Sequence, residues 1–216
     1  VAGEDTALLA ASHLNLGNAF FRLGKSDSAF NAYLQREHSG EPFQNPKTEL
    51  FFRLHFARAA IQLQVYDVAL DQILLAHHLN KTFKRKEFTG PISAVAAAAH
   101  FQAGLHNDAL PWFNQAYEYY KSEAHWDQAI PLLRGKALSL MYTQQTARAR
   151  ASFNELLHHL KAGHTPKAGA DSFFAIVAQV PADANNITQG PFGFSSQHEF
   201  AIGLGKLAAL HLKTGH

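Results

Sequence analysis

The chain has 216 residues, of which 47% are hydrophobic and 17% are charged, so it can bury a sizeable core. Its 19 basic and 17 acidic residues give a formal charge of only +2, which argues against a general nucleic-acid-binding protein. The absence of cysteine excludes disulfides, thiol nucleophiles and cysteine-ligated metals. It fits a cytoplasmic or a periplasmic protein equally, so the compartment stays open.

The N-terminal residues and the hydropathy bear on processing and on membrane-spanning segments. Residues 1–5 carry no initiator Met and no apolar signal region, so we expect a mature chain or a fragment of a larger protein. A bacterial source is expected from the general character of the sequence and from no motif. No uninterrupted apolar run reaches the length of a membrane span, and we predict no membrane-spanning segment.

The first predicted element is a helical hairpin. Apolar residues recur at helical spacing from Leu8 to Leu23, and Gly24 is suited to end that helix. Ser26 is a predicted N-cap for a second helix that runs through Tyr33. The connection is only a few residues long, so we expect the two helices to be antiparallel neighbours.

The hairpin recurs with a 40-residue period. Counting from an anchor alanine, four positions keep one residue character in all four copies: alanine at the anchor, a small residue twelve before it, Gly or Gln five before it, and a large apolar residue four after it. Small residues permit close approach of helices, and Gly or Gln is suited to a turn. The four columns are Ala29, Ala69, Ala109 and Ala149; Gly17, Ala57, Ala97 and Ala137; Gly24, Gln64, Gly104 and Gln144; and Tyr33, Ile73, Phe113 and Phe153.

The later units follow the same plan, with Pro42, Pro46 and Pro91 expected between units. No strand-like alternation competes with helix in the first 160 residues. The predicted helices are 48–63 and 67–83, 92–103 and 107–121, then 127–142 and 146–161.

Leu16-Gly17, Phe20, Ala29 and Tyr33 resemble the tetratricopeptide repeat pattern, with Pro42 near the expected closing proline. The resemblance covers about residues 5–161. It implies an all-α fold, a right-handed superhelical stack of antiparallel helix hairpins of the α-α solenoid type. We therefore predict four repeats in residues 1–161.

The remaining residues break the period. Residues 162–196 have the composition of an irregular linker, with a short apolar element at 171–180. Residues 197–216 resemble the first helix of a further repeat. Asn186-Ile187-Thr188 fits a glycosylation acceptor, which matters only in a eukaryotic secretory route.

Catalytic and metal-binding patterns are few. Neighbouring histidines on a helix, such as His158 and His159, point in different directions, so we predict no metal site and no cofactor. Gly203-Leu204-Gly205-Lys206 lacks the flanking residues of a phosphate-binding loop, and no nucleophile motif occurs. The basic run Lys81 to Lys86 is expected to be a solvated helix end rather than an RNA-binding surface.

The resemblance also implies where recognition occurs, because in tetratricopeptide arrays the first helix of each unit lines an inner groove. Amide side chains there can bond a peptide backbone, Arg can hold a carboxylate with two hydrogen bonds, and aromatic residues can offer apolar contact. The candidate partner-binding residues are Asn18, Arg22, His55, Arg58, Gln62, Phe101, Gln102, Arg134 and Tyr142.

We therefore expect a non-enzymatic scaffold that binds a partner protein, with an acidic or C-terminal peptide as the favoured ligand. The alternative is a sensory or regulatory domain whose groove takes a small molecule or glycan and controls an attached effector. An enzyme is the third possibility.

Overall fold

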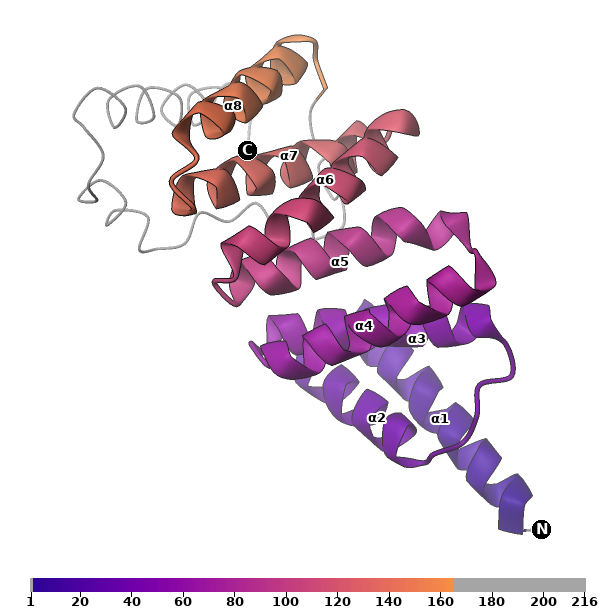
Figure 1. Ribbon diagram of the computed structural model, residues 1–216. Helices are drawn as coiled ribbons and strands as arrows, with labels where there is room; N and C mark the ends of the chain where they lie inside the picture. Colours follow the sequence, from indigo (N-terminus) through magenta and orange to yellow (C-terminus); the bar gives the residue numbers. More distant parts are fainter. Residues whose placement is uncertain (1, 165–216) are drawn as a thin grey trace. The chain divides into compact units, whose positions relative to one another are not determined.

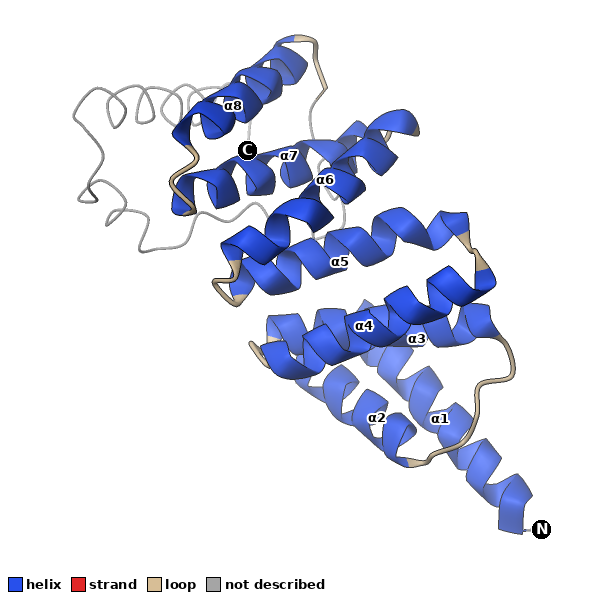
Figure 2. Cartoon of the chain, in the orientation of Figure 1, coloured by secondary structure: helices blue, strands red, loops and turns tan. Residues whose placement is uncertain are grey.

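The computed structural model describes residues 2–164, the side chains from Asp5 onward. Within this range the chain forms eight α-helices and one short 3-10 turn, with no strand (Figure 2). The helices are α1 (Ala2–Arg22), α2 (Ser26–His38), α3 (Pro46–Gln62), α4 (Tyr66–Phe83), α5 (Thr89–Gln102), α6 (His106–Ser122), α7 (Trp126–Tyr142) and α8 (Thr146–Lys161), with the turn η1 (Lys86–Phe88) before α5.

The helices follow one another as hairpins (Figure 1), and neighbouring helices pack in sequence order. The chain divides into two compact units, Val1–Tyr119 and Tyr120–His216, at a point inside α6. In the first unit α1 also contacts α3, and α3 contacts α5. The all-α fold is thus confirmed, and the packing order is compatible with an α-solenoid.

The predicted glycosylation acceptor and the C-terminal repeat helix lie outside the described residues, as does nearly all of the predicted linker. No described helix combines the length and apolar composition needed to span a membrane.

A single turn geometry joins the two helices of every hairpin. Gly24, Gln64, Gly104 and Gln144 all have positive φ, between 61° and 77°. In each turn the next residue donates its N–H to the carbonyl five residues earlier, at 2.8–2.9 Å, which is the Schellman arrangement. The predicted column of helix-ending residues is confirmed. The same bonds close the turn at Ala124 between α6 and α7.

The other columns form the core of the hairpins. The four anchor alanines are buried, and so are Ala57, Ala97 and Ala137. A Cβ added to Gly17, the remaining member of the small-residue column, would lie 2.5 Å from the ring of Tyr33, so only glycine fits beneath that ring. The large apolar column is buried at Tyr33, Ile73 and Phe113 and half-buried at Phe153.

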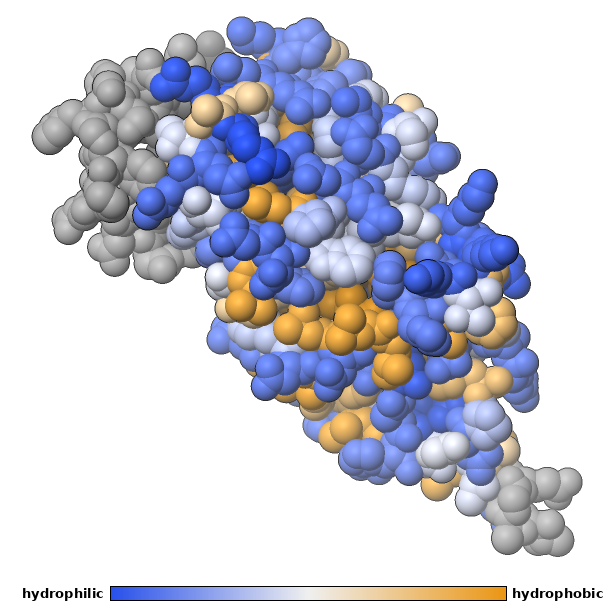
Figure 3. All heavy atoms as spheres, in the orientation of Figure 1, coloured by the Kyte–Doolittle hydropathy of each residue, from blue (hydrophilic) through white to orange (hydrophobic). Residues whose placement is uncertain are grey.

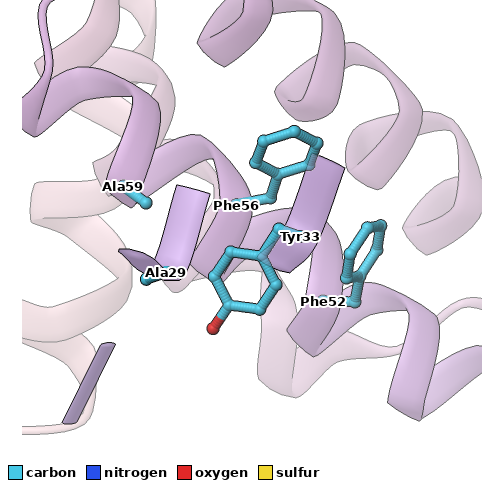
Figure 4. Packing of buried hydrophobic residues seen from close by; sticks show 5 residues of the cluster. All are labelled: Ala29, Tyr33, Phe52, Phe56 and Ala59. Carbon is cyan, nitrogen blue, oxygen red and sulfur yellow. The ribbon is translucent and has the colours of Figure 1, made fainter. Parts of the chain in front are cut away.

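Tyr33 is the centre of an aromatic cluster between the first two hairpins. Figure 4 shows its ring among Ala29, Phe52 and Phe56, with the hydroxyl directed away from the phenylalanine rings. The ring centroid lies 5.7 Å from that of Phe52 and 5.9 Å from that of Phe56. This packing joins α2 to α3 and holds the Tyr33 hydroxyl toward α1.

Two arginines tie the first two hairpins together. Arg36 is buried, with its guanidinium carbon 3.9 Å from the centroid of Phe43, and it donates to the carbonyl of Glu41 at 2.8 Å. Arg53 on α3 donates to Glu37 on α2 at 2.6 Å and to Gln72 on α4 at 2.9 Å. These bonds hold the linker between α2 and α3 and connect three successive helices.

The helix starts differ from the sequence prediction at three residues. Ser26 is the first residue of α2 and not its N-cap, which is Lys25 with no side-chain bond. Pro46 is not between units but begins α3, where Asn45 caps the helix by accepting from the Thr48 N–H at 2.8 Å. Pro91 lies in the first turn of α5. A first helical turn tolerates proline because its N–H groups have no helical partner.

Candidate functional site

Five of the nine candidate binding residues lie on α1 and α3, two helices that contact each other. Asn18 and Arg22 are one turn apart on α1, and His55, Arg58 and Gln62 follow at helical spacing on α3. We use the name α1–α3 cluster for Asn18, Phe21, Arg22, Tyr33, His55 and Arg58; contacts connect these residues except Arg22, whose charge acts on the Tyr33 hydroxyl.

The side-chain oxygen of Asn18 connects three helices. The Tyr33 hydroxyl of α2 donates to Asn18 Oδ1 at 3.0 Å, and His55 Nδ1 of α3 lies 3.2 Å from the same oxygen. Because that oxygen can only accept, His55 donates from Nδ1. Asn18 therefore fixes the orientation of the imidazole, which places the opposite ring nitrogen, Nε2, away from this bond.

Phe21 is the aromatic centre of the cluster. The ring of His55 stacks on it with a centroid distance of 4.9 Å and an interplanar angle of 15°. The guanidinium carbon of Arg58 lies 4.9 Å from the same ring centroid. Stacking and cation–π attraction thus order both basic side chains on one aromatic ring. The sequence analysis missed Phe21, although the 40-residue period makes it equivalent to Phe101, which was named as a candidate; that equivalence is the signal that could have found it.

The electrostatics of the cluster are positive. Burial raises the pKa of the Tyr33 hydroxyl, and the charges of Arg58 and Arg22 oppose that rise. The positive charges of both arginines therefore act on the Tyr33 hydroxyl, which lies beside Asn18. With the titratable His55, the cluster presents basic groups and polar hydrogen-bonding groups around an ordered aromatic ring. Such a set suits a carboxylate with an adjoining apolar group.

The other candidate residues are placed differently. Gln62 is exposed and accepts a hydrogen bond from the Ser26 hydroxyl, which links the end of α3 to the start of α2. Phe101 was expected to offer an accessible apolar platform, and this placement is wrong: it is 3% exposed, in contact with Phe113 and His106. The alanine-rich α5 is buried on most sides, which draws Phe101 into the core. Gln102 is half-buried on the same helix.

Arg134 and Tyr142 lie on α7, in the second unit, and both are half-buried. Burial lowers the pKa of the Arg134 guanidinium. The α1–α3 cluster therefore includes neither Arg134 nor Tyr142.

Two further surfaces lie outside the set of candidate residues. Figure 3 shows apolar surface over α4, the helix that carries the exposed Leu74 and Leu75, but α4 contributes none of the candidate residues. In the basic run, Lys84 has φ 51° and ends α4, and Arg85 pairs with Glu87 at 3.7 Å. This run is at a helix end, as expected.

Residues 2–164 contain no group of three or more His, Asp or Glu side chains placed to hold a metal ion. Comparison with protein-family models and with curated proteins finds no match for the chain.

Proposed function

We propose that the chain is a protein-interaction scaffold of the tetratricopeptide-like kind and that the α1–α3 cluster binds an acidic or C-terminal segment of a partner protein. The observation that carries the proposal is the ordering of His55 and Arg58 on Phe21, beside the hydrogen bond from Tyr33 to Asn18. Preordered basic side chains lose little conformational entropy when they bind a carboxylate.

The residue chemistry favours a peptide over other anions. Asn18 lies beside the basic groups and can bond a peptide amide, while the guanidinium of Arg58 matches the two oxygens of a carboxylate. The first helix α3 contacts both α1 and α5, so an extended segment bound at the cluster can continue along α3 toward Gln62.

Peptide selection tests the proposal. A random peptide library displayed with free C-termini is selected on the full chain, and the enriched peptides are synthesised and titrated by fluorescence anisotropy. We expect enrichment of acidic or C-terminal carboxylate peptides. The Arg22→Glu/Arg58→Glu variant should bind them at least about tenfold more weakly, since a hydrogen bond to a charged group contributes about 1.5–3 kcal/mol.

The control is Arg148→Glu/Arg150→Glu, which makes the same charge change at two exposed positions of α8. It should keep affinity within about twofold, apart from a long-range effect that salt removes. Circular dichroism verifies that both variants keep their helix content. If the selected peptides bind both variants alike, or if C-terminal amidation and neutral replacement of their acidic residues leave binding unchanged, the proposed site is wrong.

A further inference from the structure

The C-terminal end of α8 brings two histidines together. His159 lies in the last turn of α8, and Gly163 follows the helix with φ 82°. The N–H of His164 donates to the carbonyl of His159 at 3.1 Å, which closes a Schellman turn. The backbone bond therefore holds the two residues side by side, although four residues separate them.

The two imidazoles face each other through their Nδ1 edges. Nδ1 of His159 lies 3.3 Å from Nδ1 of His164, whereas the ring centroids are 5.5 Å apart. The nitrogens are closer than the centroids by about the width of one ring, so each Nδ1 is directed toward the other ring. The two nitrogens are thus the nearest parts of the pair.

Trp126, the first residue of α7, orders both rings. Its indole stacks on His164 with a centroid distance of 4.1 Å and an interplanar angle of 5°, and it lies 4.6 Å from His159. A flat contact of this kind restricts rotation of the imidazole about its side-chain bonds. Both ligand-type nitrogens are therefore held in place before anything binds.

Their separation matches a metal-binding geometry. A tetrahedral Zn²⁺ ion binds histidine nitrogen at about 2.0–2.1 Å, which places two such nitrogens about 3.3–3.4 Å apart. We propose that His159 and His164 bind a late first-row divalent metal ion, such as Zn²⁺ or Cu²⁺, through their two Nδ1 atoms. The remaining coordination positions are taken by water or by a side chain of a partner.

The proton between the two Nδ1 atoms does not prevent a metal ion from binding. In the metal-free pair one Nδ1–H donates to the other Nδ1. On binding, that proton moves to Nε2 of the same ring, so both imidazoles stay neutral and both Nδ1 lone pairs are available. Neutral imidazole is the form that binds these metals, and imidazole nitrogen suits Zn²⁺ and Cu²⁺ better than Mg²⁺.

Calorimetric titration of the chelator-treated full chain with Zn²⁺ tests the site. His159→Ala and His164→Ala should each remove the tightest binding step or weaken it at least about tenfold. His158→Ala is the matched control, because it removes the adjacent histidine and leaves the Nδ1 pair intact; its affinity should stay within about twofold. Mg²⁺ should give no such step, since it prefers oxygen ligands.

Trp126 supplies a second readout that locates the ion. The chain has two tryptophans, so Trp112→Phe leaves Trp126 as the sole indole. Cu²⁺ should quench its fluorescence with saturation at one equivalent, and adding His164→Ala should abolish that saturation while circular dichroism stays unchanged. The proposal is overturned if the wild-type chain shows no saturable Zn²⁺ step, or if His158→Ala weakens binding as much as the two ligand variants do.

Discussion

Gly17 shows how one missing side chain shapes the first hairpin. Its Cα lies under the ring of Tyr33, and a Cβ there would approach two ring carbons to 2.5 Å. The ring has little room to move, because Phe52 and Phe56 pack on it. Gly90 has the same relation to Tyr119, with an added Cβ 2.0 Å from that ring. Both glycines are required by packing, although each lies in a helix.

Gly17→Ala should therefore destabilise the protein by about 1–3 kcal/mol, the usual cost of overpacking a core. The sign of the change in the free energy of unfolding is informative, since Gly→Ala at an unobstructed helical site stabilises a protein by about 1 kcal/mol. Chemical denaturation measures the free energy of unfolding. In a Tyr33→Leu background the same change should be neutral or stabilising. A Gly17→Ala variant more stable than the wild type would contradict the close contact.

His159 makes the stability of the second unit depend on pH. Its pKa in the folded chain lies below the value of about 6.5 for the unfolded chain, mainly because of burial. The unfolded state therefore takes up this proton first as the pH falls. The contribution of neutral His159 is fully present above about pH 6.5 and is lost as the pH falls through the folded pKa.

With a chelator present, the wild type should lose more stability between pH 8 and pH 5 than His159→Asn does. Asn keeps a polar atom near the position of Nδ1 and has no titrating group. Thermal unfolding followed by circular dichroism at several pH values gives the comparison. Identical pH profiles would show that His159 titrates normally in the folded chain.

At the level of elements, the helical turns carry a small conformational cost. Gln64 and Gln144 have φ 61°, in the left-handed region, where Gly24 and Gly104 stand in the other hairpins. A residue with a side chain is destabilised by about 1–2 kcal/mol in this conformation. Replacing it by glycine removes that cost, but the greater freedom of glycine in the unfolded chain offsets part of the gain.

Gln64→Gly and Gln144→Gly should each stabilise the protein by about 0.5–1 kcal/mol. The control is Gln35→Gly in the exposed face of α2, which should destabilise by about 1 kcal/mol as glycine does inside a helix. Differential scanning calorimetry distinguishes the two signs. If Gln64→Gly lowers the melting temperature as much as Gln35→Gly does, the turn is not strained.

The same turns explain why the elements could be predicted. The Gly or Gln column marked the end of the first helix of each hairpin, and α8 begins and ends at the predicted Thr146 and Lys161. The sequence analysis missed a shorter spacing: positive-φ residues fall every 20 residues from Gln64 through Lys84, Gly104 and Ala124 to Gln144. Lys84 and Ala124 escaped notice because neither is a residue type that favours the left-handed region.

At the level of the molecule, the periodicity of the sequence predicted the all-α helical hairpins. The sequence predicted only part of the candidate site. The resemblance to the tetratricopeptide repeat predicted Asn18 and Arg58 on the first helices of two successive units, and helical spacing fixes the face on which each residue lies. It misplaced Phe101, since burial depends on how tightly α5 is enclosed by its neighbours and not on its own period. His164 was missed as a partner of His159, because a turn and not a helix brings them together.

Among the described helices, the main contacts join elements no more than two places apart along the chain. Chains dominated by such local contacts fold fast, because little loop entropy is lost before a contact forms. Where helices pack mainly on near neighbours in the sequence, folding can begin at more than one place and spread along the chain. During synthesis the aromatic cluster around Tyr33 is complete once α3 has left the ribosome. The N-terminal hairpins can therefore already present the α1–α3 cluster while the rest of the chain is still being made.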